Sequence, residues 1–423
     1  MRRLFALTAV MAMVGAACHG GSPTAASSSG GSSPLPLPTG PLCNGFAPSP
    51  TPSSAVSAAP SLPAIIAQVA QQAEQVRELA FRSPVTPEPV TATRMSELVR
   101  ENVADPQGVA LLKREQQPLI TIGALPAGTD LPQAVSDLVG SDVIGFYDTK
   151  THRLVFIGST SPTPYQRMVL AHELTHALDD QYFRLTQLDD MNGRCIDDQQ
   201  EAFLALAEGD AVENSLKWDD RFLSASGKQR LEQEQSAFPP LPSSIPPFVV
   251  SSFQFPYPNG LTFVQMLLAG GGEAAINAAF RNPPQSTEQI IHPDKFTFDP
   301  PTPVNVPDIG PKLGPGWTEV DNEEVGEAFL DLLLQLRLPQ SQAYPAGAGW
   351  DGGRFLSWSN GPHNAVLMET VWDTANDATE FAKAMTDFTK GRFASVEPVG
   401  TKVAVLFATD KSTLTSLHNA TAG

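Results

Sequence analysis

The amino-acid sequence predicts an α+β protein, and three stretches of the chain indicate it. Residues 167–181 have the apolar pattern of a buried helix. Just before them, residues 142–148 and 152–157 flank a short polar turn, as the strands of a β-hairpin do. The C-terminal part has the pattern strand, helix, strand, helix, over residues 365–371, 379–388, 403–407 and 412–418. We therefore expect a helical centre beside a hairpin, followed by a layer of helices packed on one sheet.

The composition is that of a soluble protein large enough to bury a functional site. The chain has 423 residues, of which 41% are hydrophobic, and its length allows about two or three domains. Its formal net charge is −18, from 45 acidic and 27 basic side chains. Because phosphate binding needs a basic surface, we expect no nucleic-acid partner.

The N-terminus has the pattern of an export signal. A basic start at residues 1–3 is followed by an apolar run over residues 4–14 and by small residues at 15–17. The run is too short to span a membrane, so we expect residues 1–17 to be a signal peptide and the mature protein to be extracytoplasmic. Cys18 resembles the acylated cysteine of bacterial lipoproteins, although Gly15 departs from their usual motif. The resemblance implies a lipid anchor on a bacterial membrane; the alternative is ordinary cleavage, giving a secreted or periplasmic protein.

Residues 18–61 consist almost entirely of Gly, Ser, Pro, Thr and Ala, a composition that cannot bury apolar surface. We expect a disordered tether, which would hold the folded part away from a membrane and therefore favours lipidation of Cys18. Helical periodicity over residues 64–81 and 93–103 predicts that a helical N-terminal region follows, at residues 62–125.

The predicted helix over residues 167–181 carries three side chains that can bind a metal ion or transfer a proton. His172 and His176 are four positions apart and lie on one helix face, so both imidazoles can bind a single metal ion. Glu173 borders that face and can take a proton from a water at the metal, which is the role of a general base. The helix is apolar nearly all round, as helices inside a domain are, and unpaired polar groups there are costly. The pattern H-E-x-x-H in this context indicates a metal site.

A catalytic zinc site takes three protein ligands and leaves one position open, so a third ligand is needed. The helical run over residues 200–213 places Glu208 beside its apolar stripe, far enough beyond His176 for the chain to turn and return. Gly209 follows directly. Glycine costs a helix about 1 kcal/mol relative to alanine, so its presence predicts that another backbone approaches here.

The string His172-Glu173-Leu174-Thr175-His176 followed by Glu208 resembles the gluzincin class of zinc metallopeptidases. The string through Asp180 is similar to the thermolysin active-site helix, whereas the ligand spacing is more similar to secreted bacterial neutral zinc metallopeptidases. The resemblance covers residues of roughly 140 to 215. It implies a zincin-like catalytic domain, which we place at residues 126–300, with Zn²⁺ bound by His172, His176 and Glu208. It also implies hydrolysis of peptide bonds with Glu173 as the base.

The same resemblance suggests roles for neighbouring groups. The predicted hairpin resembles, by its position, the strand edge that binds substrate backbone in gluzincins; an internal sheet strand is the alternative. Asp180 could orient the imidazole of His176, a role that Asp179 and Asp210 could fill equally well. The class commonly presents a Tyr or His to the developing oxyanion, and the candidates here are Tyr257 and His292, each with a structural role as the alternative.

Residues 301–423 are expected to form a C-terminal α/β region after a Pro- and Gly-rich boundary. A helix is predicted over residues 261–268 in the preceding region, ending at the glycines 270–272, and a second helix follows to Arg281. Within the C-terminal region, residues 323–336 predict an apolar helix and residues 349–354 a tight turn around an aromatic ring.

Cys43 and Cys195 are the cysteines that remain once Cys18 is removed or acylated. Because disulfides persist outside the cytoplasm, we expect these two to form a bridge; the alternative is that Cys43 caps the zinc and keeps the enzyme latent.

These observations predict an exported, membrane-tethered zinc metallopeptidase. One alternative is a zinc amidase that cleaves a non-peptide or cell-wall amide, which the same constellation would serve. The other is a non-catalytic surface protein with a structural zinc site. The open coordination position argues against the second alternative, because structural zinc sites are closed by a fourth protein ligand.

Overall fold

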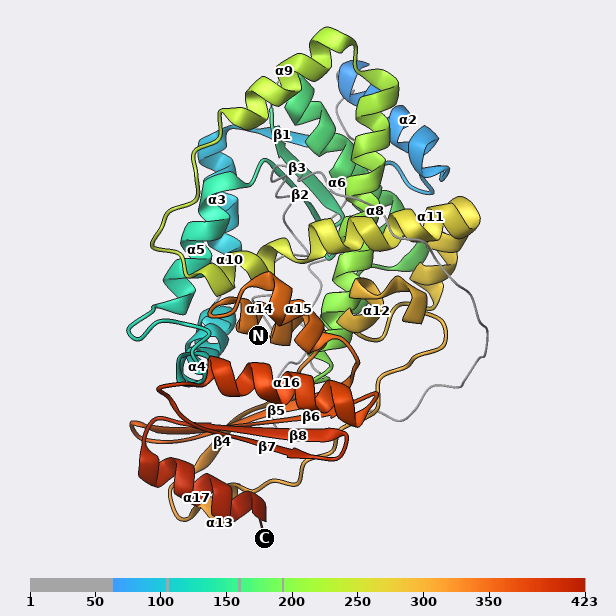
Figure 1. Cartoon of the computed structure of the whole chain (residues 1–423). Helices are drawn as coiled ribbons and strands as arrows, with labels where there is room; N and C mark the ends of the chain where they lie inside the picture. The colour runs from blue at the N-terminus through green and yellow to red at the C-terminus, as the bar shows by residue number, and fades with distance from the viewer. Residues whose placement is uncertain (1–63, 104–105, 159–160, 192–193, 423) are drawn as a thin grey trace.

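The computed structural model describes residues 64–422 except 104–105, 159–160 and 192–193. It is an α+β structure with a three-stranded and a five-stranded sheet, as the sequence predicts (Figure 1). The predicted signal peptide, the tether, Cys18 and Cys43 lie outside the described residues. No helix in the described ranges is long and apolar enough to cross a membrane.

The two predicted ligand helices are present and pack against each other. Helix α6 spans Pro164–Phe183 and begins with a capping box, in which Thr163 and Gln166 satisfy each other's backbone N–H groups. Helix α8 spans Asp197–Phe222 and lies alongside α6 (Figure 1). The apolar side chains of α6 are buried on all sides, as its sequence predicts for a helix in the middle of a domain.

The predicted hairpin is also present and belongs to the smaller sheet. Strands β2 (Gly145–Asp148) and β3 (Arg153–Ile157) pair antiparallel, and β1 (Glu88–Val90) pairs with β3 in parallel. The strand order β1-β3-β2 leaves β2 at the edge of the sheet. Strand β2 packs on α6 so closely that a side chain at Gly145 would lie 3.1 Å from Val169 and 3.3 Å from Glu173.

A third long helix, α11 (Pro256–Arg281), crosses α8 at a pair of glycines. A Cβ atom on Gly209 would lie 2.1 Å from the carbonyl carbon of Gly260, and one on Gly260 would lie 1.9 Å from the carbonyl oxygen of Ala205. The close backbone approach predicted at Gly209 is therefore confirmed. Helix α11 has one break, at Gly272 with φ of 63°, where the sequence predicts a boundary between two helices.

We expect Gly209→Ala to destabilise the protein by about 1–3 kcal/mol, because the added methyl group forces the two helices apart. Gly270→Ala in α11 is the matched control, since no atom lies within 4 Å of the position of its new Cβ. Alanine there favours the helix and should leave stability unchanged or slightly raised. Chemical denaturation measures both; equal stabilities of the two variants would show that the crossing tolerates a methyl group.

The N-terminal helices surround the central pair. Helix α2 (Ala64–Arg77) packs on α6 and α8. Helix α3 (Ala92–Val103) contacts the small sheet and α5 (Leu131–Asp142), whereas α4 (Pro106–Ile122) packs on α5 and on the five-stranded sheet (Figure 1). Since β1 comes from the same region and pairs with β3, the N-terminal region is built into the body that contains the ligand helices.

The first three quarters of the chain contain further helices. They are α7 (Gln187–Met191), α9 (Ala225–Ser236), α10 (Pro247–Gln254), α12 (Thr287–Ile291), the 3₁₀ helix η3 (Pro293–Lys295) and α13 (Gly310–Leu313).

The C-terminal layer is an antiparallel sheet in the order β4-β5-β6-β8-β7. Its strands are β4 (Thr318–Glu324), β5 (Trp350–Asn360), β6 (His363–Trp372), β7 (Phe393–Val399) and β8 (Lys402–Ala408). Alternate residues of a strand face opposite sides. Val366 and Met368 accordingly join the core with α16 (Ala375–Phe388), whereas Ala365 and Leu367 join the core with α17 (Lys411–Ala422). Figure 1 shows α16 on one face and α17 with α13 on the other.

The structure corrects two predictions in this layer. The predicted helix over residues 323–336 begins later: residues 318–324 form the edge strand β4, and the helix is α14 (Glu327–Gln335), followed by α15 (Gln340–Gly347). The predicted turn over residues 349–354 is instead the start of β5. Two neighbouring backbones leave no room for side chains at its glycines. A Cβ atom on Gly352 would lie 2.1 Å from the carbonyl oxygen of Thr302, and one on Gly353 would lie 2.4 Å from that of Val325.

Candidate metal centre

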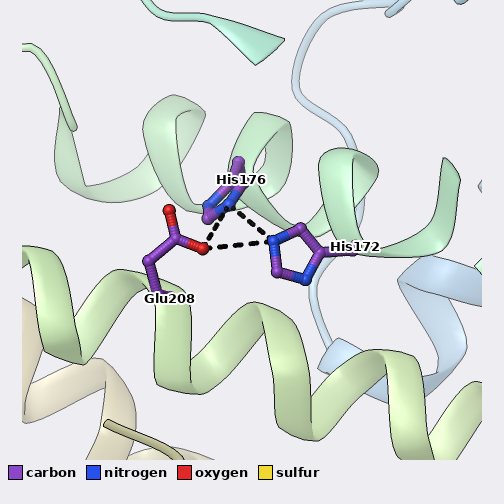
Figure 2. A group of neighbouring side chains, drawn as sticks. All are labelled: His172, His176 and Glu208. Atoms are coloured by element: carbon purple, nitrogen blue, oxygen red, sulfur yellow. Dashed lines mark hydrogen bonds and ion pairs between the residues drawn. The ribbon is translucent and has the colours of Figure 1, made fainter. Parts of the chain in front are cut away.

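The structure brings the three predicted ligands together between α6 and α8 (Figure 2). The Nε2 atom of His172 lies 3.2 Å from Oε2 of Glu208 and 3.1 Å from Nε2 of His176. The third distance, from Nε2 of His176 to Oε2 of Glu208, is 3.4 Å. The i, i+4 spacing on α6 and the packing of α8 against it are sufficient to form this triangle.

The triangle has the dimensions of one face of a coordination tetrahedron. With zinc bonds of ~2.0–2.1 Å, ligand atoms at tetrahedral angles lie ~3.3 Å apart. The three contacts cannot all be hydrogen bonds while Glu208 is ionised, because each imidazole nitrogen either donates or accepts and the carboxylate only accepts. Among the described residues, the other group with three candidate ligand atoms, Glu288, Asp299 and Asp373, surrounds the ammonium group of Lys295, which forms an ion pair with each of them.

Burial and charge set the protonation of the triangle. Burial lowers the pKa of His172, which keeps its imidazole neutral, the form that binds metals. Burial also lowers the pKa of His176, but the carboxylates of Glu208 and Glu173 outweigh it and raise this pKa to about 9. For Glu208, burial favours the acid form, yet the two imidazoles outweigh it and lower the pKa. Without a metal, His176 and Glu208 form an ion pair, and a cation would displace the proton from His176.

Glu173 lies beside the triangle without belonging to it. Its side chain is 1% exposed, and its carboxylate accepts the backbone N–H of Tyr147 from strand β2 while Oε1 has no hydrogen-bond partner. Burial raises its pKa to about 8. A cation held by the three ligands would lower that pKa by charge attraction. Glu173 is thus a buried carboxylate with one free oxygen next to a potential cation, the properties required of a general base.

A buried arginine that no sequence pattern indicates joins the helices beside the triangle. Arg77, the last residue of α2, is fully buried, with Nε 2.9 Å from Asp179 and 2.6 Å from Asp210, and Nη1 3.0 Å from Glu273. Asp179 follows His176 by three residues in α6, and Asp210 follows Glu208 by two in α8. The guanidinium group therefore fixes the two ligand helices to each other and to α11.

The structure decides among the three carboxylates considered for orienting His176. Asp180 is turned away: it accepts hydrogen bonds from Tyr147 Oη at 3.0 Å and from the backbone of Leu185 at 2.8 Å, and lies 3.1 Å from His152. The suggestion that Asp180 orients the imidazole is therefore wrong. Asp179, its neighbour in α6, raises the pKa of His176 through its negative charge.

The two candidates for stabilising an oxyanion lie on later elements of the chain. His292 caps α12 and lies 2.9 Å from Glu327, in a separate cavity of about 420 Å³ that Asp331 and Tyr344 also line. The structure does not bring His292 to the three ligands. Tyr257 is buried in α11, one turn before the glycine crossing with α8, and its catalytic role stays a prediction.

Cys195, just before α8, is engaged in a disulfide bond, which confirms half of the predicted bridge. Its partner lies outside the described residues, where the chain has Cys18 and Cys43. We expect Cys43. Intact mass and peptide mapping of the exported protein, after alkylation without reduction, should show one linked peptide pair containing residues 43 and 195. A peptide that links residues 18 and 195 would overturn this assignment and the lipid anchor together.

Comparison with known proteins gives a match for the C-terminal region. Residues 313–421 match the family described as "Domain of unknown function (DUF8575)", which covers the five-stranded sheet with α14 to α17. No curated protein and no solved structure matches the chain.

Proposed function

We propose that this chain is an exported zinc-dependent metallopeptidase of the gluzincin type. The observation that carries the proposal is the triangle of His172, His176 and Glu208, whose edges of 3.1–3.4 Å suit three ligands of one tetrahedral ion. Two imidazoles and one carboxylate are one of the ligand sets of catalytic zinc sites. Such sites have three protein ligands, the number that this group has among the described residues. Zinc bound there would act as a Lewis acid that makes a water acidic and polarises a carbonyl group.

The protein's own residues supply the proton transfers in this proposal. The free Oε1 of Glu173 receives a proton from the water and returns it to the leaving nitrogen. Burial of Glu173 and His172 excludes bulk water, which strengthens electrostatic interactions in the site.

Strand β2 supports a peptide as the substrate. It is the edge strand of its sheet, and it lies against the part of α6 that carries Glu173. An extended peptide can hydrogen-bond to such an edge, which would bring a backbone amide beside the triangle. We place the enzyme outside the cytoplasm, anchored through Cys18, on the basis of the N-terminal sequence.

Cleavage of an unfolded protein tests the proposal. Zinc-loaded protein should degrade a reduced and alkylated substrate, lose this activity in a zinc chelator, and recover it when Zn²⁺ is restored. A peptidoglycan fragment with amide crosslinks serves as the second substrate. Zinc-dependent cleavage of that fragment alone would favour the amidase alternative, and no cleavage of either substrate by the zinc-loaded protein would contradict the proposed hydrolase.

A further inference from the structure

A second group of carboxylates lies at the N-terminal end of α8, two turns before Glu208. A small cavity there has a volume of about 10 Å³, close to the minimum that holds one water molecule or ion. Asp197, Asp198 and Glu201 line it from the first turns of α8, and Glu324 lines it from the end of β4. The i, i+3 and i, i+4 spacing brings the three α8 carboxylates to one side of the helix.

Two of these four carboxylates, Asp197 and Glu201, have no hydrogen-bond donor, whereas Glu324 accepts the backbone N–H of Gln199. Glu201 is 2% exposed, and neither of its oxygens has a hydrogen-bond partner. Asp197 is 3% exposed and faces another carboxyl group, that of the fully buried Glu323. Asp198 differs, because the backbone N–H and hydroxyl of Thr287 donate to it at 3.0 and 2.6 Å. The positive end of the helix dipole favours Asp197 and Asp198 in the first turn, but it does not supply a partner for Glu201.

The nearest cation does not neutralise the group. Arg354 of β5 donates to the side-chain and backbone oxygens of Asn322 and to the backbone oxygen of Cys195. Its charge acts on Glu324, Glu323 and Asp197 from a distance. The positive charge of one guanidinium group is thus the countercharge near five carboxyl groups, at residues 197, 198, 201, 323 and 324. Burying carboxylates with so few countercharges is unfavourable unless they bind protons or a cation.

We propose that this cavity binds one Ca²⁺ ion through Asp197, Glu201 and Glu324. The donors are all carboxylate oxygens, which Ca²⁺ prefers and Zn²⁺ does not require, and Ca²⁺ accepts irregular geometry with water completing its shell. The donor atoms of this group do not all lie within 4.8 Å of one another, as those of the triangle do, so binding of the ion requires these side chains to move towards it. Gly326 also lines the cavity and packs against Asp198. A Cβ atom at residue 326 would lie 1.5 Å from the Asp198 carboxylate, so only glycine fits there.

The ion would join α8 to the C-terminal sheet. Glu201 and Asp197 belong to the helix that carries Glu208, whereas Glu324 is the last residue of the edge strand β4. Calcium would thereby hold the DUF8575 region against the metal centre. This proposal does not depend on the proposed peptidase function, because it requires neither zinc nor catalysis.

Calcium binding is tested on the full mature chain kept in buffered Zn²⁺. Equilibrium dialysis counts bound Ca²⁺, and thermal denaturation is followed from zero to 10 mM Ca²⁺, with Mg²⁺ in parallel. One Ca²⁺ should bind per chain and raise Tm; at a hundred times the Kd the rise should be about 3–4 °C. The isosteric variant Glu201→Gln should lose this rise, whereas Asp220→Asn at the exposed far end of α8 should keep it.

The two variants also distinguish an ion from bound protons. In calcium-free buffer, Glu201→Gln should be at least as stable as the parent, because it removes a buried carboxylate that has no partner. In calcium the order should reverse. A parent protein that binds no Ca²⁺ at 10 mM, and whose Tm rises only as the pH is lowered, would overturn the proposal in favour of protonated carboxyl groups. Zinc content, measured in the same samples, separates this outcome from failure of the zinc site.

Discussion

Replacing Glu173 with Gln should reduce turnover by at least ~10²–10⁴-fold, the contribution typical of general acid–base catalysis. Glutamine keeps the shape of the side chain and can still accept the N–H of Tyr147, but its amide cannot take up a proton. Glu173 is not a member of the ligand triangle, so zinc content should stay at the parental value. Turnover of an unfolded protein substrate, together with zinc analysis of the same preparation, measures both effects.

The melting temperature of Glu173→Gln should not fall, because the change replaces a buried carboxylate whose Oε1 has no partner. The exposed residue Glu232 of α9 provides a matched Glu→Gln control that should keep full activity. Peptidase activity near the parental level in Glu173→Gln would show that another group moves the proton, whatever the zinc content.

Arg77→Met should destabilise the protein by about 3–5 kcal/mol, the cost of breaking a buried ion pair by removing one partner. Methionine fills much of the space but leaves Asp179, Asp210 and the partly buried Glu273 without their shared cation. Because two of these carboxylates flank zinc ligands in sequence, zinc affinity should also fall, by the ~10–100-fold typical for groups that support ligands. Chemical denaturation and a competition assay with a fluorescent zinc chelator give the two values.

Arg94→Met is the control for this prediction, since Arg94 forms only exposed ion pairs with Glu97 and Glu101 on α3. Such pairs contribute ~0–1 kcal/mol, so its stability should be close to that of the parent. A loss below ~1 kcal/mol in Arg77→Met would mean that the buried carboxylates are neutral and that Arg77 does not hold the helices together.

The grouping of His172, His176 and Glu208 could be predicted from the sequence, because the patterns that indicate it are local. The spacing of His172 and His176 fixes a helix face, and the apolar run around Glu208 predicts a second buried helix. Gly209 predicts that another backbone approaches α8, because a glycine inside a helix is destabilising unless the close contact requires it. Arg77 could not be found in this way. It contacts Asp179 across 102 positions, and a single arginine at a helix end has no distinguishing pattern.

The errors in the C-terminal layer have physical causes as well. Strand β4 has the sequence Thr-Glu-Val-Asp-Asn-Glu-Glu, which lacks the apolar alternation of a strand, and its last residue, Glu324, lines the acidic cavity beside α8. The glycines at 352 and 353 suggest a turn, but in the structure they let two neighbouring backbones approach an interior strand. Similarly, His292 was considered for catalysis because no packing pattern explained it, and its partner Glu327 lies in a helix 35 residues further on.

The most direct test of the account is the number of zinc atoms bound per chain in the parent and in Glu208→Ala. The parent, purified without added metal chelator, should contain one zinc per chain. Glu208→Ala removes the only ligand that α8 supplies, so zinc content should fall well below one and Tm should fall with it, because metal binding stabilises the folded state. A parent protein that binds no zinc at micromolar free Zn²⁺, or a Glu208→Ala variant that keeps one zinc per chain, would contradict the metal centre described here.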